Sequence, residues 1–173
     1  MPTTPLPGQK APDLVLPLIV GGEWDLHRQE PETFTMIVVY RSLHCPICKT
    51  YLATLRNLYE SFLSKGIQAI NVSMDSEDRA RQAHEAWGLD PIPMAYGMSE
   101  ATAREWGLFL SKRRKDSEPP IFAEPGLFLV TRDGTLWMID VANVPFVRPD
   151  LKGLLDRADM LVENAGGPPR GGD

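Results

Sequence analysis

The feature that most constrains this chain is a change from a buried-strand pattern to a helical pattern at the tetrapeptide Cys45-Pro46-Ile47-Cys48. The run Met36-Ile37-Val38-Val39-Tyr40 is typical of a strand that is buried on both faces. After the tetrapeptide, apolar side chains recur at helical spacing, at Ile47, Tyr51, Leu55, Leu58, Tyr59 and Phe62. Pro46 suits the first helical position, because it lacks an amide hydrogen and its φ is already near the helical value. The pattern predicts a helix over about 46–64 with Cys45 as its N-cap.

The two cysteines of the tetrapeptide are the only cysteines in the chain, and their position favours redox chemistry. Unpaired amides at a helix N-terminus stabilise a thiolate more than a thiol, so we expect a lowered pKa at Cys45. A disulfide across three residues would close too short a loop to act as a structural staple. Zinc would need four ligands, and the three histidines show no finger-like spacing, so we expect neither a metal site nor another cofactor.

Length and composition favour one soluble domain. The 173 residues suffice for a single core, with 43% hydrophobic and 24% charged residues and no apolar run near the length of a membrane helix. Residues 14–20 lack the basic flank and cleavage site of an export signal, so we expect a cytoplasmic protein. A net charge of -5 argues against a nucleic-acid partner. The basic run Lys112-Arg113-Arg114-Lys115 is interpreted as a solvated loop, because acidic residues follow it directly.

The order of the expected elements predicts an α/β domain with a thioredoxin-like fold: a central mixed sheet flanked by helices, with an N-terminal β-hairpin extension. The hairpin would turn at Gly21-Gly22, after an extended arm that reaches Pro12. The strand–helix–strand unit that ends at Val72 favours parallel pairing, and Asp133-Gly134 signals a later antiparallel hairpin. The remaining elements are expected at 76–87, 94–96, about ten residues from Ser99, and a final helix over 151–161. Residues 1–165 would form the domain, with a disordered tail over 166–173.

Two segments resemble a known family. Gly8-Gln9-Lys10-Ala11-Pro12-Asp13-Leu14 resembles the opening of peroxiredoxins. Tyr40-Arg41-Ser42-Leu43-His44-Cys45-Pro46-Ile47-Cys48-Lys49-Thr50-Tyr51-Leu52 resembles the CPxC-containing, peroxiredoxin-like branch of the AhpC/TSA (redoxin) family. The resemblance spans about Gly8 to Leu161. It implies antioxidant thiol chemistry on a peroxide or disulfide substrate, with an external thiol reductant such as a thioredoxin-type protein or glutathione, and it leaves a homodimer open.

The sequence departs from that family at three positions. Typical members place a proline seven residues and a threonine three residues before the attacking cysteine, where this chain has Val38 and Ser42. Ser42 retains a hydroxyl that can donate to a thiolate or a peroxide oxygen. The family arginine at the start of a later strand falls at about Pro125, so Arg41 and Arg148 are considered as its substitutes.

Pro125 also allows a different interpretation. The pair Glu124-Pro125 resembles the cis-proline that faces the CxxC motif in thioredoxin-like disulfide reductases, which leaves a cis bond open at this position. The stretch 111–125 shows no periodicity, which is typical of a lid or a mobile loop.

Three functions follow as alternatives. In the first, Cys45 reduces peroxides and Cys48 resolves the intermediate, with His44, if protonated, adding to the stabilisation of the thiolate. In the second, the same pair exchanges disulfides with proteins. In the third, the domain is a non-enzymatic redox-sensing or binding module, which the missing family arginine favours.

Overall fold

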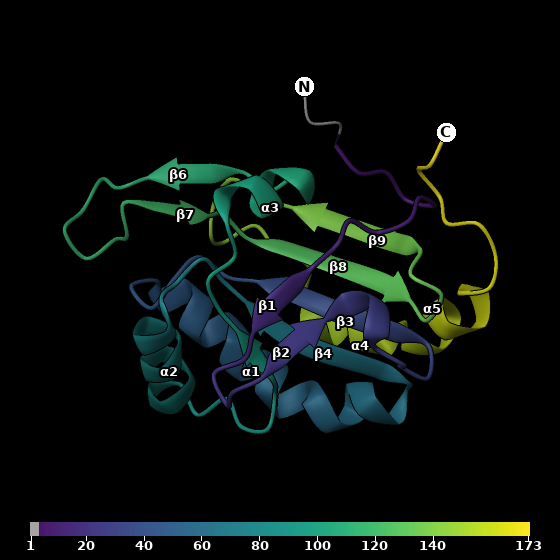
Figure 1. Cartoon of the computed structure of the whole chain (residues 1–173). Helices are drawn as coiled ribbons and strands as arrows, with labels where there is room; N and C mark the ends of the chain where they lie inside the picture. Colours follow the sequence, from purple (N-terminus) through teal and green to yellow (C-terminus); the bar gives the residue numbers. More distant parts are fainter. Residues whose placement is uncertain (1–3) are drawn as a thin grey trace.

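The computed structural model describes residues 4–173 and contains a mixed five-stranded sheet in the order β5-β4-β3-β8-β9 (Figure 1). Strands β3, β4 and β5 run parallel, whereas β8 and β9 are antiparallel to their neighbours. The bounds are Phe34–Val39 for β3, Ile67–Val72 for β4, Met94–Ala95 for β5, Gly126–Thr131 for β8 and Leu136–Val141 for β9. The predicted thioredoxin-like architecture with a central mixed sheet is confirmed.

Both faces of the sheet are covered, and the central strand shows why. Every residue of β3 is buried. Phe34, Met36 and Val38 face one apolar core, whereas Ile37 and Val39 face a second core on the opposite side. Successive side chains of a strand point to opposite faces, so a strand between two cores is apolar at nearly every position.

Helices α1, α2, α4 and α5 cover the first face, and the N-terminal hairpin and α3 cover the second (Figure 1). Their bounds are Pro46–Ser64 for α1, Glu77–Ala86 for α2, Glu100–Glu105 for α3, Leu151–Asp156 for α4 and Ala158–Asn164 for α5. The hairpin pairs β1 (Val15–Pro17) with β2 (Glu23–Asp25), and a short 3-10 helix follows at Leu26–Arg28. The predicted hairpin extension is present, although residues 1–3 of the predicted arm lie outside the described residues.

Two of the predicted helices differ from the observed ones. The helix from Ser99 has six residues rather than about ten, because Trp106 caps it and Gly107 follows with a φ of 72°. The predicted final helix is divided at Arg157, whose backbone leaves the helical region with φ -103° and ψ 6°. The Arg157 guanidinium donates to the carbonyl of Gly153 at 3.1 Å and satisfies one of the acceptors that this break exposes.

The stretch 111–125 was predicted to lack regular structure, and that prediction is wrong. Strands β6 (Leu110–Lys112) and β7 (Ile121–Ala123) form a small antiparallel hairpin beyond the central sheet (Figure 1). Its turn is held by Glu118, whose carboxylate accepts from the amides of Arg114 at 2.7 Å and Lys115 at 3.0 Å. Each of these strands has only three residues, which is too short for an alternating apolar pattern to be recognised in the sequence. No helix within residues 4–173 is long and apolar enough to cross a membrane.

The packing of α1 on the sheet yields a stability prediction. Phe62 is fully buried in the last turn of α1, whereas Phe109 is 50% exposed. Replacing a buried phenylalanine by alanine costs roughly 3–5 kcal/mol through lost transfer energy and a new cavity. We expect Phe62→Ala to lower the free energy of unfolding by about that amount in urea titrations followed by tryptophan fluorescence, and Phe109→Ala, the matched control, to change it by less than about 1 kcal/mol. Equal losses would contradict this packing.

Candidate active site

The two cysteines lie at the first turn of α1, after the loop that connects β3 to this helix. Cys45 is the N-cap, as predicted, and its sulfur accepts a hydrogen bond from the amide of Cys48 at 3.2 Å. Pro46 occupies the first helical turn, also as predicted. Both thiols are free and buried, with Cys45 1% and Cys48 0% exposed. The helix N-terminus and the dithiol are therefore one structural unit.

The two thiols have opposite proton affinities. The pKa of Cys45 is lowered to about 6, first because the Cys48 thiol donates to its sulfur, and further because of the Cys48 amide and Arg41, against an opposing effect of burial. The pKa of Cys48 is raised, first by burial and then by its hydrogen bond to Cys45. At pH 7 a thiol with a pKa near 6 is about nine-tenths ionised. Cys45 therefore has the larger thiolate fraction of the two cysteines.

Arg41 supplies the positive charge on the Cys45 side. Its Nε lies 3.0 Å from a carboxylate oxygen of Glu124, and its guanidinium stacks over the ring of Phe122 at 4.9 Å. The same carboxylate accepts from the hydroxyl of Ser111 at 2.7 Å. Glu124 is 3% exposed, so this carboxylate is fixed in place by two donors and in turn fixes the arginine. Arg41 is held rigidly beside Cys45.

Ser42 does not have the role that its position predicts. Its hydroxyl donates to Asp75 Oδ1 at 2.5 Å instead of to the sulfur of Cys45, and it accepts from Arg79 Nη2 at 2.9 Å. Asp75 is 2% exposed, and its second oxygen accepts from the amide of Leu43 at 2.9 Å. A carboxylate acceptor is stronger than a thiolate at the same site, which explains why the hydroxyl turns away from the sulfur. Ser42 therefore belongs to the network that shapes the loop before Cys45.

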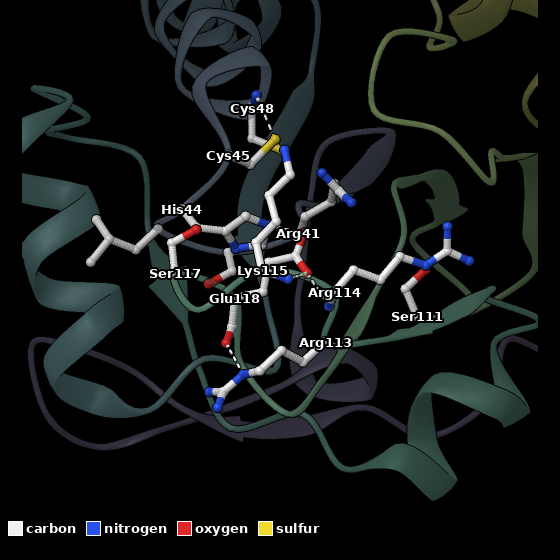
Figure 2. A network of polar contacts seen from close by, with 12 residues as sticks. Arg41, His44, Cys45, Cys48, Ser111, Arg113, Arg114, Lys115, Ser117 and Glu118 are labelled. Atoms are coloured by element: carbon white, nitrogen blue, oxygen red, sulfur yellow. Dashed lines mark hydrogen bonds and ion pairs between the residues drawn. The ribbon is translucent and has the colours of Figure 1, made fainter.

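His44 lies between the loop and the β6–β7 hairpin. Its ring contacts Phe122 edge-on at 5.0 Å, and its Nε2 is 3.9 Å from Glu118 Oε1. Neither ring nitrogen has a hydrogen-bond partner within residues 4–173. The pKa of His44 is lowered, first by burial and then by the charge of Arg41, so the ring is neutral at pH 7. The positive His44 that the sequence suggested is thus disfavoured here. Figure 2 shows His44 and Arg41 between the cysteines and the hairpin residues Arg114 and Glu118.

Arg148 lies on the opposite side of the dithiol and contacts Cys48. Its Nη2 donates to the Cys48 sulfur at 2.9 Å, and its guanidinium stacks over the ring of Tyr51 at 4.7 Å. Tyr51 is itself fixed, because its hydroxyl donates to the carbonyl of Pro149 at 2.7 Å. Both arginines proposed as substitutes for the family arginine therefore reach the site, but each contacts a different cysteine.

The bond before Pro125, whose isomer the sequence left open, is trans. Within residues 4–173 the one cis bond precedes Pro91. The chain passes here from β7 directly into β8, and the Pro125 carbonyl accepts from the amide of Ala142 at 3.0 Å. This extended crossing contains no turn that would need the less stable isomer.

Two cavities flank the dithiol. The first, of about 600 Å³, lies between the start of α1 and the segment before α4, and is lined by Pro46, Ile47, Tyr51, Phe146, Arg148 and Pro149, among others. Most of its lining side chains are apolar, and two of them are exposed to solvent, Ile47 by 41% and Phe146 by 71%. The second, of about 350 Å³, is lined mainly by polar groups, including Arg41, Arg114, Glu118 and Glu124. An apolar cavity thus includes Arg148 in its lining and a polar cavity includes Arg41, although neither cysteine lines either cavity.

Sequence reasoning missed Asp75, Arg79 and Glu118. Asp75 follows β4, and the ends of neighbouring parallel strands meet at one edge of a sheet, so its proximity to the loop after β3 could have been expected. Arg79, four residues on in α2, reaches both Asp75 Oδ1 at 3.3 Å and Ser42. No local pattern pointed to Glu118, because its partners depend on the hairpin. Within the described chain, no group of three or more metal-ligating side chains is present.

The fold and the site together define a class: a thioredoxin-fold protein with a reactive dithiol at the start of its first long helix. Residues 7–138 match the model of the AhpC/TSA family. This stretch is well over half of the chain and includes both cysteines. The chain belongs to the AhpC/TSA family.

Known proteins agree with that assignment. The chain is 30% identical over 118 residues to a peroxiredoxin of Thermoplasma volcanium, a match that covers 61% of this chain and 53% of that protein, so the chain spans about half of its length. A peroxiredoxin-like protein from Aquifex aeolicus has a TM-score of 0.74 at 14% identity, covering 92% and 90% of the two chains. Peroxidoxin BcpB from Mycobacterium tuberculosis has a TM-score of 0.70 at 16% identity, covering 91% and 96%. These two structures support the fold.

The Asp75 network yields the second prediction. Asp75→Asn removes the charge that holds Arg79 and leaves at least one of three donors without a strong acceptor, so we expect the free energy of unfolding to fall by roughly 1–3 kcal/mol. Asp78 is exposed in the first turn of α2, just after Asp75, and Asp78→Asn is the matched control. We expect its free energy of unfolding to stay within about 0.5 kcal/mol of that of the unaltered protein. Urea unfolding measures both. If Asp75→Asn lowers the free energy of unfolding no more than Asp78→Asn does, the Asp75 network does not stabilise the fold.

The proton affinity of Cys45 yields the third prediction. In Cys48→Ser, a hydroxyl can still donate to the Cys45 sulfur, whereas in Cys48→Ala it cannot, and Cys45 is the sole thiol in both variants. The rate of alkylation by iodoacetamide follows the thiolate fraction, so it rises with pH and levels off above the pKa. We expect a midpoint near pH 6 in Cys48→Ser, close to the pKa of Cys45 in the unaltered protein, and a higher midpoint in Cys48→Ala. Identical midpoints in the two variants would show that the side-chain hydrogen bond does not lower this pKa.

Proposed function

We propose that this protein is a thiol peroxidase in which Cys45 attacks the peroxide and Cys48 resolves the oxidised sulfur. The observation that carries the proposal is the position of Cys45, a lowered-pKa thiol that caps a helix and faces a fixed arginine. Membership of a family that includes peroxiredoxins supports the same chemistry.

In the first step, the Cys45 thiolate attacks one oxygen of the peroxide. A sulfur–oxygen bond forms, the oxygen–oxygen bond breaks, and the departing alkoxide or hydroxide takes up a proton. The sulfur is oxidised to sulfenic acid and the peroxide is reduced to an alcohol or water. Arg41 fits the role that the family arginine has elsewhere, because its planar guanidinium lies beside the sulfur and can donate to the peroxide oxygens while Glu124 keeps it oriented.

The buried dithiol is reached more easily by a small peroxide than by a polypeptide, because either a protein disulfide or a protein reductant requires the site to open. Cys45 is 1% and Cys48 is 0% exposed, so neither sulfur is in contact with a docked polypeptide unless the site opens. Hydrogen peroxide is hardly larger than water and needs only a narrow path. The trans bond before Pro125 also removes the feature that most suggested a disulfide reductase.

The oxidised pair requires an external thiol to complete a cycle. Attack on the Cys45–Cys48 disulfide would return both cysteines to the thiol state, with a thioredoxin-type protein or glutathione as the class of reductant. The apolar cavity beside Ile47 and Phe146 is the natural approach for such a partner, because exposed apolar surface next to a reactive sulfur favours docking. The cycle requires a compartment whose thiol reductants keep the pair reduced, and the cytoplasm is the compartment that we propose.

Rapid mixing with hydrogen peroxide tests the proposal. Reduced protein is followed by tryptophan fluorescence in a stopped-flow instrument, beside Cys45→Ser and Cys48→Ser. We expect a fast phase whose rate is proportional to peroxide concentration, present in the unaltered protein and in Cys48→Ser, and absent in Cys45→Ser. In Cys48→Ser the product should be a sulfenic acid that reacts with dimedone, because no second thiol is available to resolve it.

Each contrary result has a distinct meaning. A rate no greater than that of an ordinary thiol would reject the peroxidase and leave disulfide exchange or redox sensing by the same pair. Fast oxidation without turnover by any thiol reductant would favour the sensor. Loss of the fast phase in Cys48→Ser alone would reverse the roles of the two cysteines.

A further inference from the structure

Arg148 differs from Arg41 in one respect that matters for Cys48. Arg41 is neutralised by Glu124, whereas no carboxylate within residues 4–173 pairs with Arg148. The Nε and Nη1 atoms of Arg148 are buried and have no hydrogen-bond partner within the same residues. The one hydrogen bond of its guanidinium is the 2.9 Å contact with the Cys48 sulfur. Because the Arg148 guanidinium has so few partners, it favours the thiolate form of Cys48 over the thiol.

In the reduced protein, other groups keep that anion from forming. Besides Arg148, the charged or titratable groups that face Cys48 are Cys45, Arg41 and Tyr40. The negative charge of Cys45 opposes ionisation of Cys48, and the Cys48 proton is engaged in its hydrogen bond to that sulfur. Arg41 contributes only a backbone hydrogen bond, and the Tyr40 phenol stays neutral because burial raises its pKa. Within residues 4–173, Arg148 is the only cationic side chain that contacts the Cys48 sulfur.

Oxidation of Cys45 reverses this balance. A sulfenic acid is neutral near pH 7, so the negative charge beside Cys48 disappears when the thiolate is oxidised, while Arg148 remains. The two effects of Cys45 that hold the proton on Cys48 are lost together, and the attraction of Arg148 is left unopposed.

Resting on the proposed peroxidase function, we propose that Arg148 is the catalytic residue of the resolving step, which converts Cys48 into a thiolate once Cys45 has been oxidised. The Cys48 thiolate then attacks the sulfur of the Cys45 sulfenic acid. A sulfur–sulfur bond forms, the sulfur–oxygen bond breaks, and the departing hydroxide combines with the proton released by Cys48 to give water. Cys48 is oxidised, Cys45 is reduced from sulfenic acid to disulfide, and no further reactant is needed.

The arrangement also orders the two reactions. While Cys45 is a thiolate, Cys48 is a protonated donor that lowers the pKa of the nucleophile, and after oxidation it becomes a nucleophile itself. Tyr51 holds Arg148 in position throughout, because the ring under the guanidinium is fixed by the Pro149 carbonyl. One thiol therefore serves both steps, and the charge of its neighbour determines which role it has.

The kinetic test uses Arg148→Met, which replaces the aliphatic part of the side chain and removes the cationic guanidinium. After rapid mixing with hydrogen peroxide, the disulfide forms in a second phase that is independent of peroxide concentration. We expect this phase to be slower by roughly tenfold or more in Arg148→Met, the change that a shift of one unit in the pKa of Cys48 produces at pH 7. Its rate should rise with pH in this variant, as the thiolate fraction becomes limiting. Arg148→Lys should restore part of the rate, and Arg132→Met, an exposed arginine, is the matched control.

A second measurement keeps the inference falsifiable without peroxide chemistry. In Cys45→Ser, the neutral hydroxyl stands where the sulfenic acid would be, and Cys48 is the only thiol. Absorbance at 240 nm follows its ionisation, and we expect the midpoint to lie about one unit or more lower in Cys45→Ser than in Cys45→Ser/Arg148→Met. Equal midpoints, or a second kinetic phase as fast in Arg148→Met as in Arg132→Met, would overturn the role of Arg148. A missing first phase in the unaltered protein would instead reject the peroxidase, and the titration alone would then decide whether Arg148 ionises Cys48.

Discussion

The hydrogen bond from the Cys48 amide to the Cys45 sulfur is the interaction on which the site depends. It exists because the helix begins at Pro46, which leaves Cys45 in extended backbone with its side chain turned back over the first turn. Serine or aspartate usually fills such a cap, and here a sulfur takes the same place and the same donor. Capping a helix and stabilising a thiolate are thus one contact, so the reactive state of Cys45 is also a state that stabilises the fold locally.

That contact requires the loop before Cys45 to reach the helix at a fixed angle, and Asp75 provides the constraint. Its carboxylate collects donors from Ser42, Leu43 and Arg79, which tie the loop after β3 to the end of β4 and to α2. The Cys45 amide then donates to the Ser42 carbonyl at 3.0 Å, which turns the chain into the helix. Burying a carboxylate lowers stability unless it is well paired. The partners of Asp75 all lie in the loop before Cys45 or in α2, so the same contacts that stabilise the carboxylate also position Cys45.

The sequence predicted the sheet, α1 and the cysteine pair well, because each rests on local patterns. The apolar run 36–40, the helical spacing up to Phe62 and the proline after Cys45 are signals that neighbouring residues carry by themselves. The hydroxyl direction of Ser42 and the packing of the β6–β7 hairpin against Arg41 and His44 depend on contacts between distant segments. His44 shows this most clearly, since its ring lies beside Glu118 and Phe122, which are more than seventy residues away in the sequence.

The missing family arginine illustrates how such a loss can be compensated. At the start of β8 the backbone offers Pro125, which has no charge, but Arg41 approaches the same thiol from the loop before the helix, and Glu124, next to Pro125, holds it there. If the protein has the proposed function, the positive charge beside the sulfur comes from the loop before α1, and the carboxylate that pairs with it lies next to Pro125. A position-by-position comparison records a loss at Pro125, whereas the geometry keeps a guanidinium beside the sulfur. Since electrostatic stabilisation depends on the distance and orientation of the charge, and not on which element carries it, the departure at Pro125 does not weigh against the chemistry.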